Sequence, residues 1–187
     1  MRIISGKLKG KSIDFLKSNT TRPLKDSVKE NIFNIITHSN LIKVNFEKSN
    51  VLDLYSGIGS FGLECISRGA DKITFVEKNK IAVDILKKNL LRLSLENKSI
   101  VVQDEISNFL KSKLEKKFEI IFLDPPFKKD DYINDLELIR KKKIYKKNHI
   151  LIIHREKKSL EVLPKIVDTI LIKTYGRSKI IFSKFLS

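Results

Sequence analysis

The chain has 187 residues, 41% of them hydrophobic, with a formal net charge of +16 and one cysteine, Cys65. This length predicts one domain with a small extension, and the lone cysteine excludes an intrachain disulfide and a cysteine metal cluster. No apolar stretch approaches the roughly 18–20 residues that span a membrane. The N-terminus is polar and lacks the apolar core of a secretory signal, so we expect a cytoplasmic protein without membrane contact.

The positive charge is typical of a protein that binds a polyanion, because Lys and Arg neutralise phosphates and release counterions. Lysine greatly outnumbers arginine, however, and Ile and Asn are abundant. A genome rich in A/T codons produces the same composition without any functional requirement. The charge therefore supports a nucleic-acid partner without proving one.

Residues 1–23 differ in pattern from the rest of the chain. Their apolar residues, interrupted by Gly6 and Gly10, predict a short β-hairpin. Pro23 ends this extended segment, because the residue before a proline avoids the helical region. We therefore expect an N-terminal β-hairpin extension over 1–23 and a main domain over 24–187.

Strand and helix patterns alternate along the main domain. The predicted strands are short apolar runs at 51–54, 72–76, 100–102, 119–123, 149–153, 166–173 and 178–185. The predicted helices begin near 25–27, follow the glycine-rich loop to about 68, begin after Asn79, and cover 107–114 and 131–141. This alternation predicts an α/β fold whose mostly parallel, seven-stranded sheet has helices on both faces, with one antiparallel strand at its end.

A glycine-rich loop, Asp-Leu-Tyr-Ser-Gly-Ile-Gly-Ser-Phe-Gly (53–62), joins the first strand to its helix. Glycine lets the chain turn sharply and lets a ligand approach the backbone closely. Glu77 and Asp104 follow the next two strands, where carboxylates can accept hydrogen bonds from a ribose and from an adenine amine. The predicted cofactor-binding residues are Asp53, Tyr55, Ser56, Gly57, Gly59, Glu77 and Asp104.

This loop suits either a nicotinamide dinucleotide or S-adenosylmethionine. Dinucleotide enzymes place the first glycine almost at the end of the strand, so that the helix N-terminus can hold the pyrophosphate. Here Asp53 opens the motif well ahead of Gly57. That order favours S-adenosylmethionine.

The most specific signal is Asp124-Pro125-Pro126-Phe127, directly after the buried strand 119–123. Two prolines fix two φ angles, so the neighbouring carbonyls point rigidly. A carboxylate and a rigid carbonyl can hold an –NH₂ group toward the methyl carbon of a sulfonium, and an aromatic ring can stack on a base. We predict that these four residues form the catalytic motif of a methyltransferase acting on a planar –NH₂ group.

The motif alone leaves the acceptor and even the class of protein open. A DNA adenine methyltransferase normally carries a target-recognition domain, for which this chain has no room. A protein-glutamine methyltransferase usually has Asn before Pro-Pro. A nicotinamide oxidoreductase and a non-catalytic RNA-binding assembly factor are alternatives from other classes.

The three histidines do not indicate a metal site, because His38, His149 and His154 are not at ligand spacing with any cysteine. We therefore expect no metal. His154 falls at a strand end, where it can face the substrate cleft or serve as an ordinary polar residue.

With these motifs in place, the chain resembles the bacterial small-subunit (16S) rRNA guanine-N(2)-methyltransferases of the RsmD type, which have the Rossmann-like class I methyltransferase fold. The segments that carry the resemblance are 1–11, 21–34, 51–64, 67–70, 75–77, 124–127 and 175–176. The resemblance implies methyl transfer from S-adenosylmethionine to the 2-amino group of one guanine in 16S rRNA. It further implies the assembling small ribosomal subunit as substrate, and we expect a monomer.

The resemblance also implies roles for individual residues. It places Gly57, Gly59, Glu77 and Asp104 around the cofactor, Asp124 and Phe127 around the guanine, and the N-terminal hairpin near RNA. The predicted RNA contacts are Lys7, Lys11, Arg22 and Arg177. Ser27 and Lys29 stand where relatives often carry arginines, which predicts a lost or moved charge contact to RNA, and Phe127 stands where tyrosine is also common.

Overall fold

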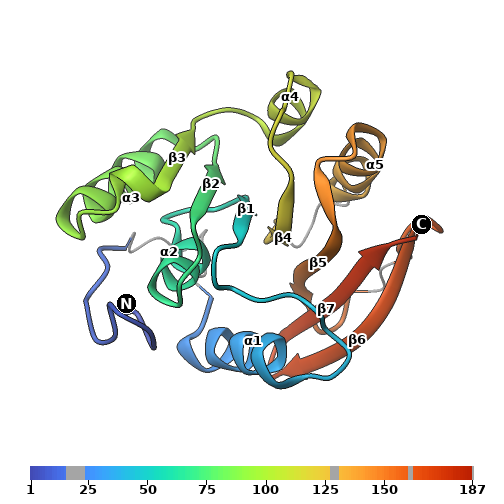
Figure 1. Cartoon of the computed structure of the whole chain (residues 1–187), viewed down its shortest axis with the longest axis horizontal. Helices are drawn as coiled ribbons and strands as arrows, with labels where there is room; N and C mark the ends of the chain where they lie inside the picture. Colours follow the sequence, from blue (N-terminus) through green and yellow to red (C-terminus); the bar gives the residue numbers. More distant parts are fainter. Residues whose placement is uncertain (16–23, 127–130, 160–161, 187) are drawn as a thin grey trace.

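The computed structural model describes residues 1–15, 24–126, 131–159 and 162–186. Arg22 and Phe127, for which the sequence predicts contacts to RNA and guanine, lie outside these ranges. Within them, the chain forms one seven-stranded sheet in the order β3-β2-β1-β4-β5-β7-β6. Helices lie on both faces of the sheet (Figure 1). None of the described helices is long and apolar enough to cross a membrane.

The strands follow the predicted apolar runs closely, and the helices separate them. The strands are β1 (Asn50–Leu54), β2 (Lys72–Val76), β3 (Ser99–Val102), β4 (Phe118–Leu123), β5 (Tyr145–Glu156), β6 (Val167–Tyr175) and β7 (Ser178–Phe185). The helices are α1 (Asp26–His38), α2 (Ser60–Ser67), α3 (Lys80–Arg92), α4 (Ile106–Lys111) and α5 (Tyr132–Lys142), with a 3₁₀ turn, η1, at Glu96–Lys98.

The direction of the strands confirms a mostly parallel sheet and corrects one detail. β7 pairs antiparallel with both β5 and β6. The reversed strand is therefore the second from the edge, and the sheet ends in two antiparallel pairs. The sequence predicts the reversed strand itself at the end of the sheet, but the short turn at Gly176 lets β6 pair with the outer edge of β7.

Side chains alternate between the two faces of each strand, which divides the core in two. On one face Ile120 and Phe122 pack with the apolar residues of α1, α2 and α3. On the other face Ile121 and Leu123 pack with those of α4 and α5. Figure 1 shows the same division of the helices. The same alternation determines toward which face of the sheet a side chain at the end of a strand points.

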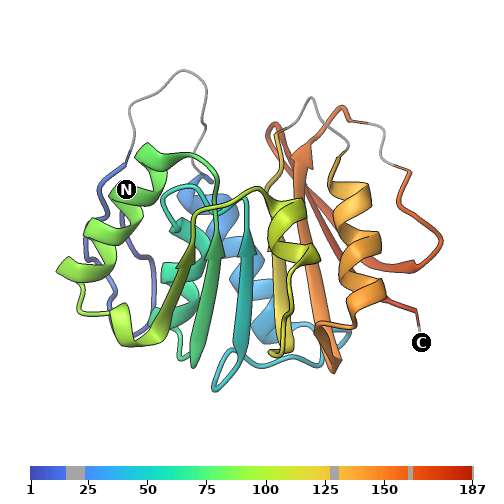
Figure 2. The same cartoon turned by 90° about the horizontal axis from the view of Figure 1, so that it is seen from above.

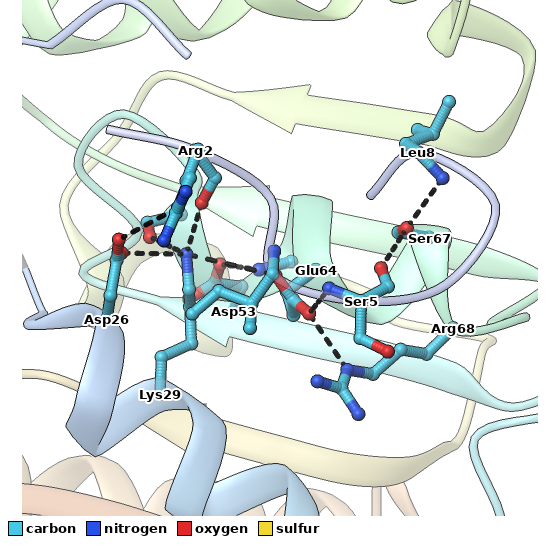
Figure 3. Close-up of polar contacts among 12 residues, drawn as sticks. Arg2, Ser5, Leu8, Asp26, Lys29, Asp53, Glu64, Ser67 and Arg68 are labelled. Carbon is cyan, nitrogen blue, oxygen red and sulfur yellow. Dashed lines mark hydrogen bonds and ion pairs between the residues drawn. The ribbon is translucent and has the colours of Figure 1, made fainter. Parts of the chain in front are cut away.

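The predicted N-terminal β-hairpin is not present in residues 1–15. The two arms of this segment meet at one isolated antiparallel bridge between Arg2 and Ser12, flanked by backbone hydrogen bonds from the N–H of Ile3 to Lys11 and from the N–H of Ile13 to Met1. The backbone N–H groups of Ile4 and Ser5 instead donate to the Glu64 carboxylate, at 2.8 and 3.0 Å (Figure 3). Because the N–H groups of Ile4 and Ser5 bond to α2, the bridge between the two arms is not extended into a pair of strands. The division between 1–23 and 24–187 stays a prediction.

Candidate active site

The predicted ligand-binding residues gather at one edge of the sheet. The last pairs in register are Leu54 with Val76, Val76 with Val102, and Leu54 with Leu123. The carboxyl ends of β1, β2, β3 and β4 therefore line up, and the arrows of β1, β2 and β3 point the same way in Figure 2. The loop after β1, Glu77, Asp104 and Asp124 all follow these ends. This is the edge where ligands bind in open α/β sheets.

Glu77 holds the glycine-rich loop to the end of β2. Its Oε2 accepts a hydrogen bond from the N–H of Gly57 at 2.9 Å, and its Oε1 accepts from the N–H of Asn79 at 2.8 Å. The N–H of Ser56 donates to the carbonyl of Val76 at 3.1 Å. Tyr55 adopts a positive φ of 59°, which sharpens the turn. The structure thus brings Glu77 and Gly57 together, as the sequence predicts.

The glycines of this loop have different roles. A Cβ built on Gly62 would lie 2.3 Å from Cε1 of Phe75, and one on Gly59 would lie 2.4 Å from Cδ1 of Leu86. These two glycines therefore let α2 and its preceding turn pack tightly on β2 and α3. A Cβ on Gly57 would meet no described atom within 4 Å. Gly57 is thus the glycine whose backbone a ligand can approach.

Asp53 and Ser56 carry buried polar atoms that lack a described partner. Asp53 is buried, and its Oδ2 accepts a hydrogen bond from the N–H of Gly62 at 3.0 Å. Its Oδ1 and the Oγ of Ser56 have no partner among the described residues. Burial raises the pKa of Asp53 well above its ordinary value, the Gly62 N–H opposes this, and the charges of Asp124 and Glu77 raise that pKa further. These groups suit a ligand that brings hydrogen-bond donors and positive charge.

Asp104 lies at the end of β3 on the same edge, half-buried. Its Oδ1 accepts hydrogen bonds from the N–H of Glu105 at 2.7 Å and from Nδ2 of Asn108 at 3.1 Å. These contacts organise the turn into α4. Contact of Asp104 with an adenine amine stays a prediction.

Tyr55 connects the loop to the other face of the sheet, a contact that the sequence did not reveal. Its hydroxyl donates a hydrogen bond to Oδ2 of Asp135, a buried residue of α5. Burial raises the pKa of Asp135, and the hydrogen bond from Tyr55 opposes that rise. Burial and the same carboxylate raise the pKa of Tyr55 as well. The loop is therefore anchored to β2 by Glu77 and to α5 by Tyr55.

The Asp-Pro-Pro segment leaves β4 and is held by β5. Oδ1 of Asp124 lies 2.8 Å from Nδ1 of His154. Nη1 of Arg155 donates to the carbonyl of Pro126 at 3.1 Å. The Asp124 side chain remains 26% exposed, which leaves it open to a substrate. Pro125 is buried under this turn.

The predicted RNA contacts receive unequal support. Lys7 and Lys11 are exposed on the N-terminal segment. Arg177 is 71% exposed, and its Nη2 donates to Oε1 of Glu156 at 3.0 Å, so part of its charge is neutralised. RNA contacts by these three residues stay predictions.

Lys29 does not lie on an RNA-binding surface. Its side chain is fully buried, and its Nζ donates to the carbonyl of Arg2 at 3.0 Å and lies 3.8 Å from Oε2 of Glu64 (Figure 3). Burial lowers the pKa of Lys29, and the charges of Glu64 and Asp26 oppose this. The sequence predicts a lost or moved RNA contact at this position, and the burial of Lys29 agrees with a lost one, because the lysine fastens the N-terminal segment to α1 and α2.

The chain is similar to known proteins over nearly its full length. The family model described as Conserved hypothetical protein 95 matches residues 1–184. A Buchnera aphidicola (subsp. Baizongia pistaciae) protein named Ribosomal RNA small subunit methyltransferase D is 33% identical over 187 residues, which cover 100% of this chain and 92% of that protein. A Haemophilus influenzae protein of the same name is 32% identical over 178 residues, which cover 94% and 89%. The solved structure of yhhF from Escherichia coli shares the fold, with a TM-score of 0.85 at 24% identity, covering 100% of this chain and 98% of that one.

Proposed function

This chain belongs to the Conserved hypothetical protein 95 family, and on that premise we propose that it transfers a methyl group from S-adenosylmethionine to the 2-amino group of a guanine in small-subunit (16S) ribosomal RNA. The shared fold is the α/β methyltransferase fold that the sequence predicts. The observation that carries the proposal is the position of Asp124. This partly exposed carboxylate follows β4 at the sheet edge where the glycine-rich loop follows the neighbouring β1.

The residues at this edge fit S-adenosylmethionine better than a nicotinamide dinucleotide. Asp53, Glu77, Asp104 and Asp124 place four carboxyl groups around the loop, and those that are ionised would repel the two negative charges of a pyrophosphate. Asp53 also has an unused buried oxygen. A ligand with a sulfonium and an ammonium group would be attracted by the carboxylates, and its N–H groups could satisfy the unused acceptors. Glu77 and Asp104 would then hold the ribose and the adenine.

When bound, S-adenosylmethionine supplies a methyl group on positively charged sulfur, and that sulfur keeps the electron pair of the broken bond. The protein then has mainly to position the acceptor. Asp124 accepts an N–H from the guanine amine and so orients the nitrogen lone pair. The nitrogen becomes cationic as it gains the methyl group, and Asp124 or water takes the proton that it releases. A guanine inside a helix must first be unstacked to reach this carboxylate.

The substrate class rests on the relatives' names and on the charge of the chain. A net charge of +16 suits the assembling small ribosomal subunit, whose phosphates need counterions. We expect the protein to act as a monomer, because one chain carries both the loop and the Asp-Pro-Pro motif. Light scattering during size-exclusion chromatography measures that state.

The acceptor is tested by offering the protein labelled S-adenosylmethionine with naked 16S rRNA, small subunits, duplex DNA or a protein mixture. We expect label in the ribosomal RNA samples alone. Asp124→Asn is the matched control, because it keeps the side-chain shape and should lower the rate by about 100-fold or more. Label confined to DNA or protein would refute the proposed acceptor. Binding of NAD without binding of S-adenosylhomocysteine would refute the proposed cofactor.

A further inference from the structure

His154 connects the Asp-Pro-Pro segment to the reversed strand of the sheet. It lies near the end of β5 and is only 5% exposed. Its Nδ1 is 2.8 Å from Oδ1 of Asp124 on the neighbouring β4 side, and its Nε2 is 3.0 Å from Oγ of Ser178 at the start of β7. The imidazole thus bridges two strands of the sheet and ends on the carboxylate that is proposed to hold the acceptor amine.

The chemistry of the two partners determines how the proton is placed on the ring. An ionised carboxylate only accepts hydrogen bonds, so Nδ1 carries the hydrogen and donates it to Asp124. In a neutral imidazole the other nitrogen then accepts, so the Ser178 hydroxyl donates to Nε2. Every polar atom of the histidine ring is used in this arrangement. No described residue donates to Oδ2 of Asp124, which remains available to a substrate.

The next residue of the strand holds the same segment from the opposite face. Because side chains alternate along β5, Arg155 points away from His154. Arg155 is 1% exposed, stacks over the Tyr132 ring at 4.7 Å, and donates to the carbonyl of Pro126. Two consecutive residues of β5 therefore hold the segment at both ends, one at its carboxylate and one at its second proline.

We propose that His154 is the positioning residue that orients Asp124 for methyl transfer. The proposal rests on the proposed function, in which Asp124 accepts an N–H from the guanine amine. An aspartate carboxylate rotates readily about its last bond. With Oδ1 held by His154, Oδ2 has a defined direction toward the substrate. Small displacements of such a group are costly, since an error of about 1 Å can lower a rate by about 100-fold.

The test compares three replacements of His154 that differ in the hydrogen bonds they can make. His154→Asn places an amide N–H near the position of Nδ1, so it keeps the donor to Asp124. His154→Gln places its amide near the position of Nε2 and loses that donor, and His154→Leu has no donor at all. The kcat and KM for small subunits, the Kd for S-adenosylhomocysteine and the melting temperature are measured for each. His149→Leu is the matched control, because His149 is on the same strand and also bonds to β7, through the N–H of Phe185.

We expect His154→Leu and His154→Gln to lower kcat by roughly 10- to 100-fold, with KM and the S-adenosylhomocysteine Kd within about threefold of the original protein. His154→Asn should recover most of that loss, and His149→Leu should leave kcat unchanged. In an Asp124→Asn background, His154→Leu should cause no further loss. If His154→Leu does not fold, the difference in kcat between the Asn and Gln variants still tests whether the donor to Asp124 is required.

The proposal is overturned if the Gln variant is as active as the Asn variant, if folded His154→Leu keeps the original kcat, or if cofactor binding falls together with kcat. Failure of the proposed function looks different. In that case Asp124→Asn would keep full activity, or the unaltered protein would not methylate 16S rRNA at all.

Discussion

Glu64 is the residue whose replacement tests the packing of the N-terminal segment most severely. It is fully buried and accepts three hydrogen bonds, from the N–H groups of Ile4 and Ser5 and from Nε of Arg68 at 2.9 Å. Lys29 Nζ lies 3.8 Å from its Oε2. At that distance and an effective dielectric of about 20, the attraction between two unit charges is about 4 kcal/mol. Glu64→Gln keeps the shape and leaves the buried Lys29 with Asp26 as its remaining carboxylate.

We expect Glu64→Gln to lower the free energy of unfolding by about 3–5 kcal/mol, the usual cost of breaking a buried ion pair. Urea denaturation followed by circular dichroism measures this loss. Adding Lys29→Met should recover about half of it or more, because the double variant no longer buries a lysine charge that has lost the Glu64 carboxylate. Hydrogen exchange at the amides of Ile4 and Ser5 should become faster in the single variant.

Lys88→Met is the matched control for this experiment. Lys88 pairs with Asp14 at 3.3 Å, but its side chain is 72% exposed, so its loss should cost less than about 1 kcal/mol. The reasoning is refuted if Glu64→Gln costs as little as this control. It is also refuted if the double variant loses the sum of the two single losses.

Two further predictions concern the glycine-rich loop. The raised pKa of Asp53 means that the folded protein holds its proton more tightly than the unfolded chain. Stability from this group is therefore greatest below the ordinary pKa of 3.8 and falls as the pH rises through the raised value. Asp53→Asn should remove that pH dependence, stabilise the ligand-free protein at pH 7 and weaken the binding of S-adenosylhomocysteine. Urea titrations at several pH values measure the stability, and calorimetry measures the binding. A pH dependence of stability that is the same in the variant as in the original protein would contradict this reasoning. Gly62→Ala should cost about 1–3 kcal/mol by forcing a methyl group against Phe75. Gly57→Ala meets no such clash, but the φ of 54° strains an alanine by about 1–2 kcal/mol, so this variant should lose some stability and also weaken cofactor binding. An equal weakening of S-adenosylhomocysteine binding in the two alanine variants, measured by calorimetry, would contradict these roles.

The strands could be predicted because they are short apolar runs, each ending at a polar or glycine-rich segment. β5 is longer than predicted at both ends, because residues 145–148 are largely exposed and lack an apolar pattern, and residues 154–156 are polar although His154 and Arg155 are buried. α4 is shorter than predicted and ends at Lys111, since the residues beyond it are mostly exposed. The local pattern of apolar and polar residues therefore predicts where the helices and strands lie, but it predicts their first and last residues less accurately.

The N-terminal segment could not be predicted correctly, because its partners are distant in the sequence. Two glycines between apolar residues are typical of a hairpin, but Gly6 instead lies against α2, where a Cβ would be 2.0 Å from the carbonyl oxygen of Ser67. Nothing near residue 4 or 5 indicates that Glu64 will accept their N–H groups. The burial of Lys29 could not be predicted for the same reason, since its partner Glu64 is distant in the sequence.

The residues of the candidate site that follow the strand ends could be predicted from the sequence, but the contacts that hold these residues in place could not. Glu77 and Gly57 do meet, because the carboxyl ends of parallel strands must share an edge. His154 could be placed at a strand end from its position after an apolar run, but its bond to Asp124 depends on the pairing of β4 with β5. Nothing in the sequence around Asp135 indicates its hydrogen bond with Tyr55, since that contact depends on how α5 packs on the sheet.

The central claim is methyl transfer to guanine in 16S rRNA, and nucleoside analysis of the labelled product tests it most directly. Small subunits lacking the modification are incubated with labelled S-adenosylmethionine and the protein, and the 16S rRNA is digested to nucleosides. We predict that the label is in N2-methylguanosine from a single position, and that Asp124→Asn binds S-adenosylhomocysteine but yields almost no label. Label in a methylated adenosine, in DNA or in protein, or full labelling by the Asp124 variant, would contradict the account.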